Sequence, residues 1–207
     1  MIHAVTPLKQ LSNGKRRLGG ALSSAERVEL IRTMSARVIS VLASMHEIAS
    51  VSVVTNDETL VPMNCARIED PGSDLNAAAA HAGRILQSWG ASSMLVIAAD
   101  LPFVTAEDIR CLIAAGRTGA AVFAADSKGL GTNAILMSPP ALFQPCFGEH
   151  SLAAHLAIAR QMGVSARIVQ RSGLARDIDE PEDLPYLIQQ GGSRYSFLQP
   201  GFKRLTE

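Results

Sequence analysis

The 207-residue sequence lacks several features that would place it in common classes of protein. No apolar run reaches the ~18 residues that a helix needs to cross a bilayer. The first ten residues, MIHAVTPLKQ, lack the basic start and long apolar segment of a secretory signal. The 19 Lys and Arg balance the 19 Asp and Glu, whereas a nucleic-acid-binding face needs an excess of positive charge. These absences predict a cytoplasmic protein that binds neither membrane nor nucleic acid.

Cysteine is also scarce. Cys65, Cys111 and Cys146 lie far apart in the chain and form neither a C-x-x-C pair nor a zinc-binding spacing. An odd number of isolated cysteines is typical of reduced thiols in a cytosolic protein. We therefore predict partly buried free thiols, without a disulfide or a zinc site.

Several catalytic and nucleotide-binding motifs are missing. No G-x-S-x-G, H-E-x-x-H or paired-glutamate motif is present, so the apparatus of common hydrolases and glycosidases is absent. Lys9 and Arg16 stand where a P-loop needs Gly and Ser or Thr. The segment GLGTNA (129–134) matches G-x-G-x-x-A but runs into an apolar segment past mid-chain, which excludes a dinucleotide fingerprint. A tight turn or an anion-binding glycine loop both remain open for it.

What is present is an alternation of strand-like and helix-like segments, with no internal repeat. The apolar patterns predict strands over 2–6, 50–55, 65–70, 92–100, 119–126, 133–138 and 166–170. Helices are expected from Ser23 or Ser24 to about 45, and over 74–89, 105–115, 151–162 and 181–190. This alternation predicts an α/β fold of three layers with a mostly parallel central sheet. We expect one domain over 1–190 and a polar C-terminal tail over 191–207.

Charged residues follow the strands of the predicted sheet. Lys9, Lys15 and Arg17 follow the first strand, Asp100 closes the central one, and Asp179 precedes the last helix. Ligands of open α/β sheets bind at the carboxyl ends of the strands, so these charges are expected to converge. The cations can neutralise a polyphosphate, although a solvated charge run would look the same. Two carboxylates with phosphate oxygens suit Mg²⁺.

Two further features bear on the site. Asp177 alternates with Asp179, so in an extended segment only one of them would join Asp100. The segment FGEHS (147–151) precedes a helix, and Ser151 as its N-cap explains the pattern by itself. A helix N-terminus also binds anions, so Gly148 and Ser151 could hold a phosphate. His150 and His155 are five residues apart, a spacing that disfavours a zinc pair.

The ordered motifs resemble one family over residues 2–190. They are PLKQLSNGKRRL, LSSAER, DLNAAAAHA, ADLPFVTAEDI, GTNAILMSPPALF, FGEHSLAAHL and GLARDIDEPEDL. Together they are similar to the guanylyltransferases of coenzyme F(420) biosynthesis. These act on 2-phospho-L-lactate, phosphoenolpyruvate or 3-phospho-D-glycerate. ADLP and DIDxPEDL also occur in the wider MobA-like nucleotidyltransferases, so the basic loop, GTN and FGxxS carry the family assignment.

The resemblance implies a Rossmann-like nucleotidyltransferase fold and Mg²⁺-dependent transfer of GMP from GTP to the phosphate of a three-carbon phospho-acid. It implies three sets of site residues. Asp100 and Asp179 would bind the metal. The nucleotide would be bound by Lys9, Lys15, Arg17 and Asn76, and Lys15 and Arg17 would join the two aspartates in catalysis. The acceptor would be bound by Thr132, Gly148 and Ser151.

The implied reaction agrees with the missing catalytic apparatus. A phosphate is already ionised at pH 7, so it needs no general base to act as the nucleophile. Two alternatives stay open: a MobA-like enzyme of molybdenum cofactor synthesis, and a non-catalytic nucleotide-binding protein. A homodimer is one expectation for the assembly.

The sequence departs from the family pattern at three places. The basic loop reads Gly-Lys-Arg-Arg-Leu instead of Ala-Lys-Ser-Arg-Leu, Asp74 replaces a glycine, and Glu180 replaces a threonine. Asp74 places an extra carboxylate near the expected nucleotide site. Glu180 replaces a good N-cap, which we expect to affect structure and not catalysis.

Overall fold

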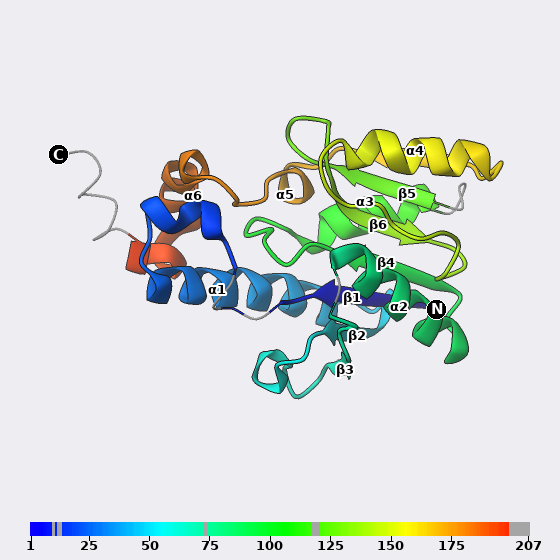
Figure 1. Cartoon of the computed structure of the whole chain (residues 1–207), viewed down its shortest axis with the longest axis horizontal. Helices are drawn as coiled ribbons and strands as arrows, with labels where there is room; N and C mark the ends of the chain where they lie inside the picture. Colours follow the sequence, from blue (N-terminus) through cyan, green and yellow to red (C-terminus); the bar gives the residue numbers. More distant parts are fainter. Residues whose placement is uncertain (10, 12–13, 73, 117–120, 199–207) are drawn as a thin grey trace.

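A computed structural model describes residues 1–9, 11, 14–72, 74–116 and 121–198 (Figure 1). Its sheet has the strand order β3-β2-β1-β4-β6-β5-β7. The strands are β1 (Ile2–Pro7), β2 (Ile48–Val54), β3 (Ala66–Ile68), β4 (Ser93–Ile97), β5 (Ala121–Ala125), β6 (Thr132–Met137) and β7 (Ala166–Val169). Of the strands in the described residues, β6 alone runs antiparallel to its neighbours, β4 and β5. The prediction of an α/β fold with a mostly parallel sheet is confirmed.

The helices in the described residues are α1 (Ser24–Ala43), α2 (Leu75–Ser88), α3 (Ala106–Gly116), α4 (Ser151–Gln161), α5 (Ser172–Ala175) and α6 (Leu184–Gly191). Of these, α5 was not predicted, and the others begin within about three residues of the predicted positions. Ser23 and Glu26 form a reciprocal capping box at α1. Asp74 caps α2 through the amide of Ala77. Asp74, one of the departures from the family pattern, therefore has a structural role as a helix cap.

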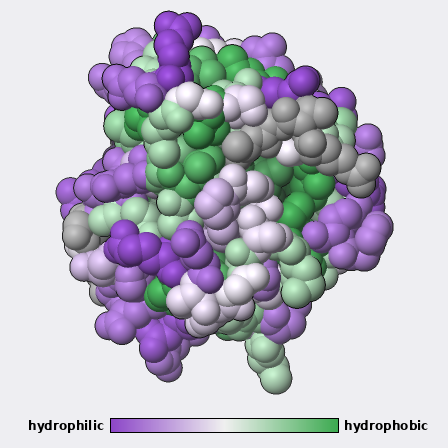
Figure 2. Space-filling model, turned by 90° about the vertical axis from the view of Figure 1, so that its right-hand side faces the viewer, coloured by the Kyte–Doolittle hydropathy of each residue, from purple (hydrophilic) through white to green (hydrophobic). Residues whose placement is uncertain are grey.

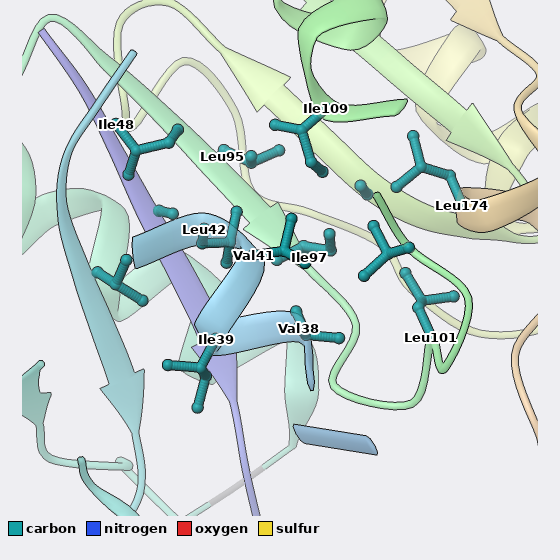
Figure 3. Close-up of a cluster of buried hydrophobic side chains, with 14 of the residues drawn as sticks. Val38, Ile39, Val41, Leu42, Ile48, Leu95, Ile97, Leu101, Ile109 and Leu174 are labelled. Carbon is teal, nitrogen blue, oxygen red and sulfur yellow. The ribbon is translucent and has the colours of Figure 1, made fainter. Parts of the chain in front are cut away.

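The sheet is covered on both faces. On one face, α1, α3 and α5 enclose a cluster that includes Val38, Leu42, Leu95, Ile109 and Leu174 (Figure 3). On the other face, α2 and α4 cover a second cluster, built around strand residues such as Val96 and Phe123. Strands β4, β5 and β6 are buried on both faces, which explains why their sequences read as continuous apolar runs.

The C-terminal boundary differs from the prediction. Residues Gly192–Leu198 form a further 3₁₀ segment, η5, in place of the first part of the predicted polar tail. Tyr195 and Leu198 are buried against Leu30 and Met34 of α1 in a third cluster. Phe197 of the same segment is partly buried against this cluster. Residues 199–207 of the predicted tail lie outside the described residues.

The last turn before α4 also differs. Ser151 is the first residue of that helix, and the preceding His150, in a left-handed conformation with φ 54°, occupies the N-cap position. The Ser151 amide donates to the carbonyl of Gly148 at 3.2 Å. The predicted serine cap was therefore wrong by one residue. Ser151 lies on the helix itself, with 2% of its surface exposed.

The side of the molecule at the amino-terminal end of β1 is shown in Figure 2. Hydrophilic groups surround smaller hydrophobic areas there.

Among the described residues, no helix is long and apolar enough to cross a membrane. The three cysteines are free: Cys65 and Cys111 are partly buried, as predicted, and Cys146 is exposed.

Gly173 of α5 marks a close contact that we expect to be intolerant of a side chain. A Cβ there would lie 2.2 Å from Asp108 Oδ2 and 2.7 Å from the carbonyl oxygen of Phe103. Asp108 is itself held by Thr105 and Arg171 and cannot move away freely. Gly173→Ala should lower the free energy of unfolding by about 1–3 kcal/mol. Urea denaturation checks this, and an unchanged midpoint would contradict it.

Candidate active site

Three carboxylates meet at the carboxyl edge of the parallel strands. Asp100 lies just beyond the end of β4, and Asp177 and Asp179 lie on the segment after α5. One oxygen from each lies within 4.8 Å of the others. The expectation that Asp177 would point away was wrong, because residues 176–179 form no strand and side chains need not alternate. Three hard oxygen donors at this spacing fit Mg²⁺.

Lys15 lies among these carboxylates. Its ammonium group donates hydrogen bonds to Asp100 and Asp179, and 9% of its side chain is exposed. The residue has the left-handed backbone conformation, with φ 51°, immediately before the 3₁₀ segment η2 (Arg16–Gly20). Burial alone would lower the pKa of Lys15, but the two carboxylates outweigh it and raise that pKa. The lysine therefore stays charged and neutralises the cluster.

The surroundings of Asp177 disfavour its charged form, whereas those of Lys15 favour the charged ammonium group. Burial and then repulsion by Asp100 raise the pKa of Asp177 to about 6. When the three carboxylates are ionised, they outnumber the ammonium group of Lys15 and leave a net negative charge. A further cation at this point would be stabilised by the surrounding oxygens.

The other cations of the basic loop are more exposed. Arg17 pairs with Glu180 at 2.8 Å, with 66% of the arginine side chain and 42% of the glutamate side chain exposed. Lys9 is exposed beyond the end of β1. Gly14 packs closely against Ile31, because a Cβ at this position would lie 2.4 Å from Ile31 Cδ1. Among the described cations of this loop, Lys15 alone is buried in the carboxylate cluster.

The loop between β5 and β6 is a tight turn. The amides of Gly129 and Leu130 donate to the backbone carbonyl and side chain of Asp126 at 3.1 and 2.8 Å. This use of the amides favours the turn over an anion-binding loop. The turn places Thr132 at the start of β6. Because β6 runs antiparallel to β4, Thr132 lies at the same edge of the sheet as Asp100.

The loop before α4 is held by Asn76 of α2. The Asn76 side chain donates to the Phe147 carbonyl at 3.2 Å and accepts from the Phe147 amide at 2.5 Å. Gly148 follows with φ 136°. Asn76, predicted to bind the nucleotide, therefore has its amide group bonded to the protein in this structure. These contacts give it a part in placing Gly148.

Sequence reasoning missed two buried residues beside the predicted set. Asn133, next to Thr132, donates to the carbonyl of Leu174 at 3.0 Å and so joins β6 to the segment that leads to Asp177. Its position within GTN was the available signal. His155, considered only as a zinc ligand, contacts Thr132 Oγ1 at 3.1 Å through Nδ1. Its spacing of four residues from Ser151 could have placed the two on one helix face.

The buried His155 predicts a loss of stability in acid. Burial lowers the pKa of His155 to about 4, so the folded protein excludes a proton that the unfolded chain takes up below about 6.5. The unfolded state then binds more protons, and stability falls as the pH drops from 6.5 to 4, by about 3 kcal/mol at most. Urea denaturation at pH 7 and pH 4.5 measures the loss.

A His155→Gln variant is the control for this pH dependence. It should lose that part of the slope, while the opposing contribution of Asp177 is common to both proteins and cancels in the comparison. Equal pH dependence in the two proteins would contradict the assignment to His155.

Two solved structures show which fold this is. The chain superposes on a protein of Desulfovibrio desulfuricans G20, provisionally described as a nucleotide-diphospho-sugar transferase. The TM-score is 0.82 and the identity 16%, over 98% of this chain and 97% of that one. It also matches a CMP:2-keto-3-deoxy-manno-octonic acid synthetase complexed with CTP, with TM-score 0.61 and 13% identity, over 96% and 99% of the two chains. The fold is that of the nucleotidyltransferases.

Sequence comparison narrows the class. Residues 2–200 match the family model described as "Guanylyl transferase CofC like". The phosphoenolpyruvate guanylyltransferase of Rubrobacter xylanophilus is 35% identical, over 94% of this chain and 97% of its own length. That of Sphaerobacter thermophilus is 34% identical, over 89% and 91%. The chain belongs to the CofC-like guanylyltransferase family and is a nucleotidyltransferase.

Proposed function

We propose that this enzyme transfers GMP from GTP to the phosphate of a three-carbon phospho-acid in coenzyme F(420) biosynthesis, and releases pyrophosphate. The observation that carries the proposal is the meeting of Lys15 with three carboxylates at the sheet edge where Thr132 begins β6. A triphosphate is bound through cations and a metal ion, and this edge has a buried lysine and three carboxylates that would hold such an ion. The names of the relatives support phosphoenolpyruvate as the first acceptor to test.

Asp100, Asp177 and Asp179 would hold Mg²⁺ in this proposal. Bound there, the ion would neutralise charge on the phosphates and on the leaving pyrophosphate. Asp100 and Asp179 accept hydrogen bonds from Lys15. Both also repel the carboxylate of Asp177. The lysine and a metal ion therefore compete for the negative charge of the cluster, and a bound ion would leave the ammonium group free to contact a phosphate.

The residues of the chain would mainly position the reactants. Lys15 and Arg17 would bind the phosphates of GTP, and Arg17 can exchange its exposed contact with Glu180 for a phosphate at little cost. Thr132, Gly148 and Ser151 would hold the acceptor. An oxygen of the acceptor phosphate then attacks the α-phosphorus of GTP. The bond from that phosphorus to the bridging oxygen of the β-phosphate breaks, and pyrophosphate leaves with the electron pair.

A substrate panel tests this proposal. Each of the four nucleoside triphosphates is mixed with phosphoenolpyruvate, 3-phospho-D-glycerate or 2-phospho-L-lactate and Mg²⁺, and pyrophosphate release is followed. We expect release with GTP and at least one acid, and a much slower rate without the acid or with EDTA. GTP binding without pyrophosphate release in any mixture would instead indicate a non-catalytic nucleotide-binding protein.

A further inference from the structure

We infer that His155 is a positioning residue for the acceptor: it orients the hydroxyl of Thr132 and fixes the loop that carries Gly148. The inference rests on the proposed function, because it concerns the site that would take the phospho-acid. It adds to that site a residue that contacts no substrate itself. The ligand group concerned is an anionic oxygen of the acceptor, on its phosphate or its carboxylate.

The imidazole ring is held rigidly. His155 is fully buried on α4, four residues after Ser151, which is buried on the same face of that helix. The ring stacks on Phe123, with centroids 5.3 Å apart and an angle of 11° between the planes. Phe147 meets it edge-on at 5.4 Å. Two aromatic contacts leave the ring little freedom to tilt, and the apolar surroundings favour its neutral form.

The hydrogen bonds determine where the ring carries its proton. The backbone amide of Cys146 can only donate, and it lies 2.9 Å from Nε2, so Nε2 must be the unprotonated nitrogen. A neutral imidazole then carries its proton on Nδ1. Nδ1 therefore donates to Thr132 Oγ1, 3.1 Å away. Since this oxygen already accepts a hydrogen bond from the ring, the threonine's own proton is left to donate to another acceptor.

Both nitrogens of His155 thus act on the predicted acceptor-binding residues. One holds Thr132 at the start of β6, and the other holds the amide of Cys146, two residues before Gly148. Asn76 fixes the intervening Phe147, and the amide of Ser151 closes the turn on the Gly148 carbonyl. A histidine that merely filled space would not need both contacts. The arrangement prepares one donor hydroxyl and one loop for an anion before it binds.

Two substitutions separate the two contacts. His155→Asn places an amide near the position of Nδ1 and can keep the bond to Thr132, while it loses the one to Cys146. His155→Gln reaches the position of Nε2 and can keep the bond to Cys146, while it no longer donates to Thr132. In each variant we expect the KM for the acceptor to rise about tenfold. The KM for GTP should change less than about twofold.

A double-mutant cycle shows whether His155 acts through Thr132. Thr132→Val removes the hydroxyl, so adding His155→Gln to it should raise the acceptor KM no further. The surface variant His46→Gln, whose side chain is 86% exposed, is the matched control and should resemble the wild type. Independently of turnover, ¹⁵N NMR should show one histidine with its proton on Nδ1 between pH 5 and 8, and that signal should be missing in His155→Gln.

In folded variants, any of four results would overturn the inference: unchanged acceptor KM values, equal rises in the KM for both substrates, additive effects in the cycle, or a proton on Nε2. A wild-type enzyme that turns over no acid would refute the proposed function instead. In that case calorimetric binding of phosphoenolpyruvate to wild type, His155→Gln and Thr132→Val still tests the inference, because weakened binding supports it and unchanged binding overturns it.

Discussion

Asp177→Asn should lower turnover by more than about 100-fold without destabilising the free protein. In the proposed reaction Asp177 contributes an oxygen to the metal site. In the free protein it is partly buried beside Asp100 and Asp179 and is repelled by both. Replacing this carboxylate with a neutral amide of the same shape removes repulsion, so the melting temperature without Mg²⁺ should be unchanged or raised. Pyrophosphate release and thermal denaturation measure the two effects.

Asp100→Asn is the matched control for this prediction. Asp100 is paired with the buried Lys15, so its loss should reduce both turnover and melting temperature. Comparing the melting temperatures of the two variants shows which carboxylate serves catalysis alone and which also holds the loop that carries Lys15. Full activity of Asp177→Asn with saturating Mg²⁺ would exclude Asp177 from the metal site, and equal loss of stability in the two variants would contradict the charge balance described above.

Lys15→Met should affect both activity and stability. The substitution leaves three neighbouring carboxylates without the cation that neutralises them. Breaking a fully buried ion pair costs about 3–5 kcal/mol. Because 46% of the Asp179 side chain is exposed and solvent screens it, we expect a loss of about 1–3 kcal/mol in the free energy of unfolding. Turnover should fall by about 100-fold or more, because the triphosphate loses its buried cation. Urea denaturation and pyrophosphate release measure these changes.

Mg²⁺ should rescue the stability of Lys15→Met but not its activity. Without a competing ammonium group, the ion should raise the melting temperature more in the variant than in the wild type. Arg17→Met is the control, because its ion pair with Glu180 is exposed and worth less than about 1 kcal/mol. That variant should keep the wild-type melting temperature and need more GTP for half-maximal rate. Equal destabilisation of both variants would contradict the buried role of Lys15.

Much of the fold followed from local patterns in the sequence. The strand that ends before Asp100 is buried on both faces and shows the continuous apolar run that this position requires. The caps at Ser23 and Asp74 lie where the polar residues precede apolar periodicity. The buried Tyr195 and Leu198 were not predictable from composition, because their burial depends on the shape of the surface that α1 presents to them.

Part of the site was also predictable from patterns in the sequence. That Asp100 and Asp179 would converge follows from the edge rule for parallel strands. The position of Asp177 depended on an irregular backbone that no periodicity describes. His155 and Asn133 act through hydrogen bonds to residues 23 and 41 positions away, and spacing along the chain does not reveal such contacts. Sequence thus located Asp100 and Asp179, whereas the roles of Asp177, His155 and Asn133 required the structure.

In the proposed reaction, the acceptor phosphate attacks the α-phosphorus of GTP. This step can be followed by incubating the enzyme with Mg²⁺, unlabelled GTP and phosphoenolpyruvate whose phosphate oxygens are ¹⁸O. Mass spectrometry then locates the label in the products. The proposed mechanism predicts that all of the ¹⁸O stays in a guanylylated acid, including the new bridging oxygen, and that the pyrophosphate is unlabelled. Labelled pyrophosphate, or GDP in place of pyrophosphate, would contradict it.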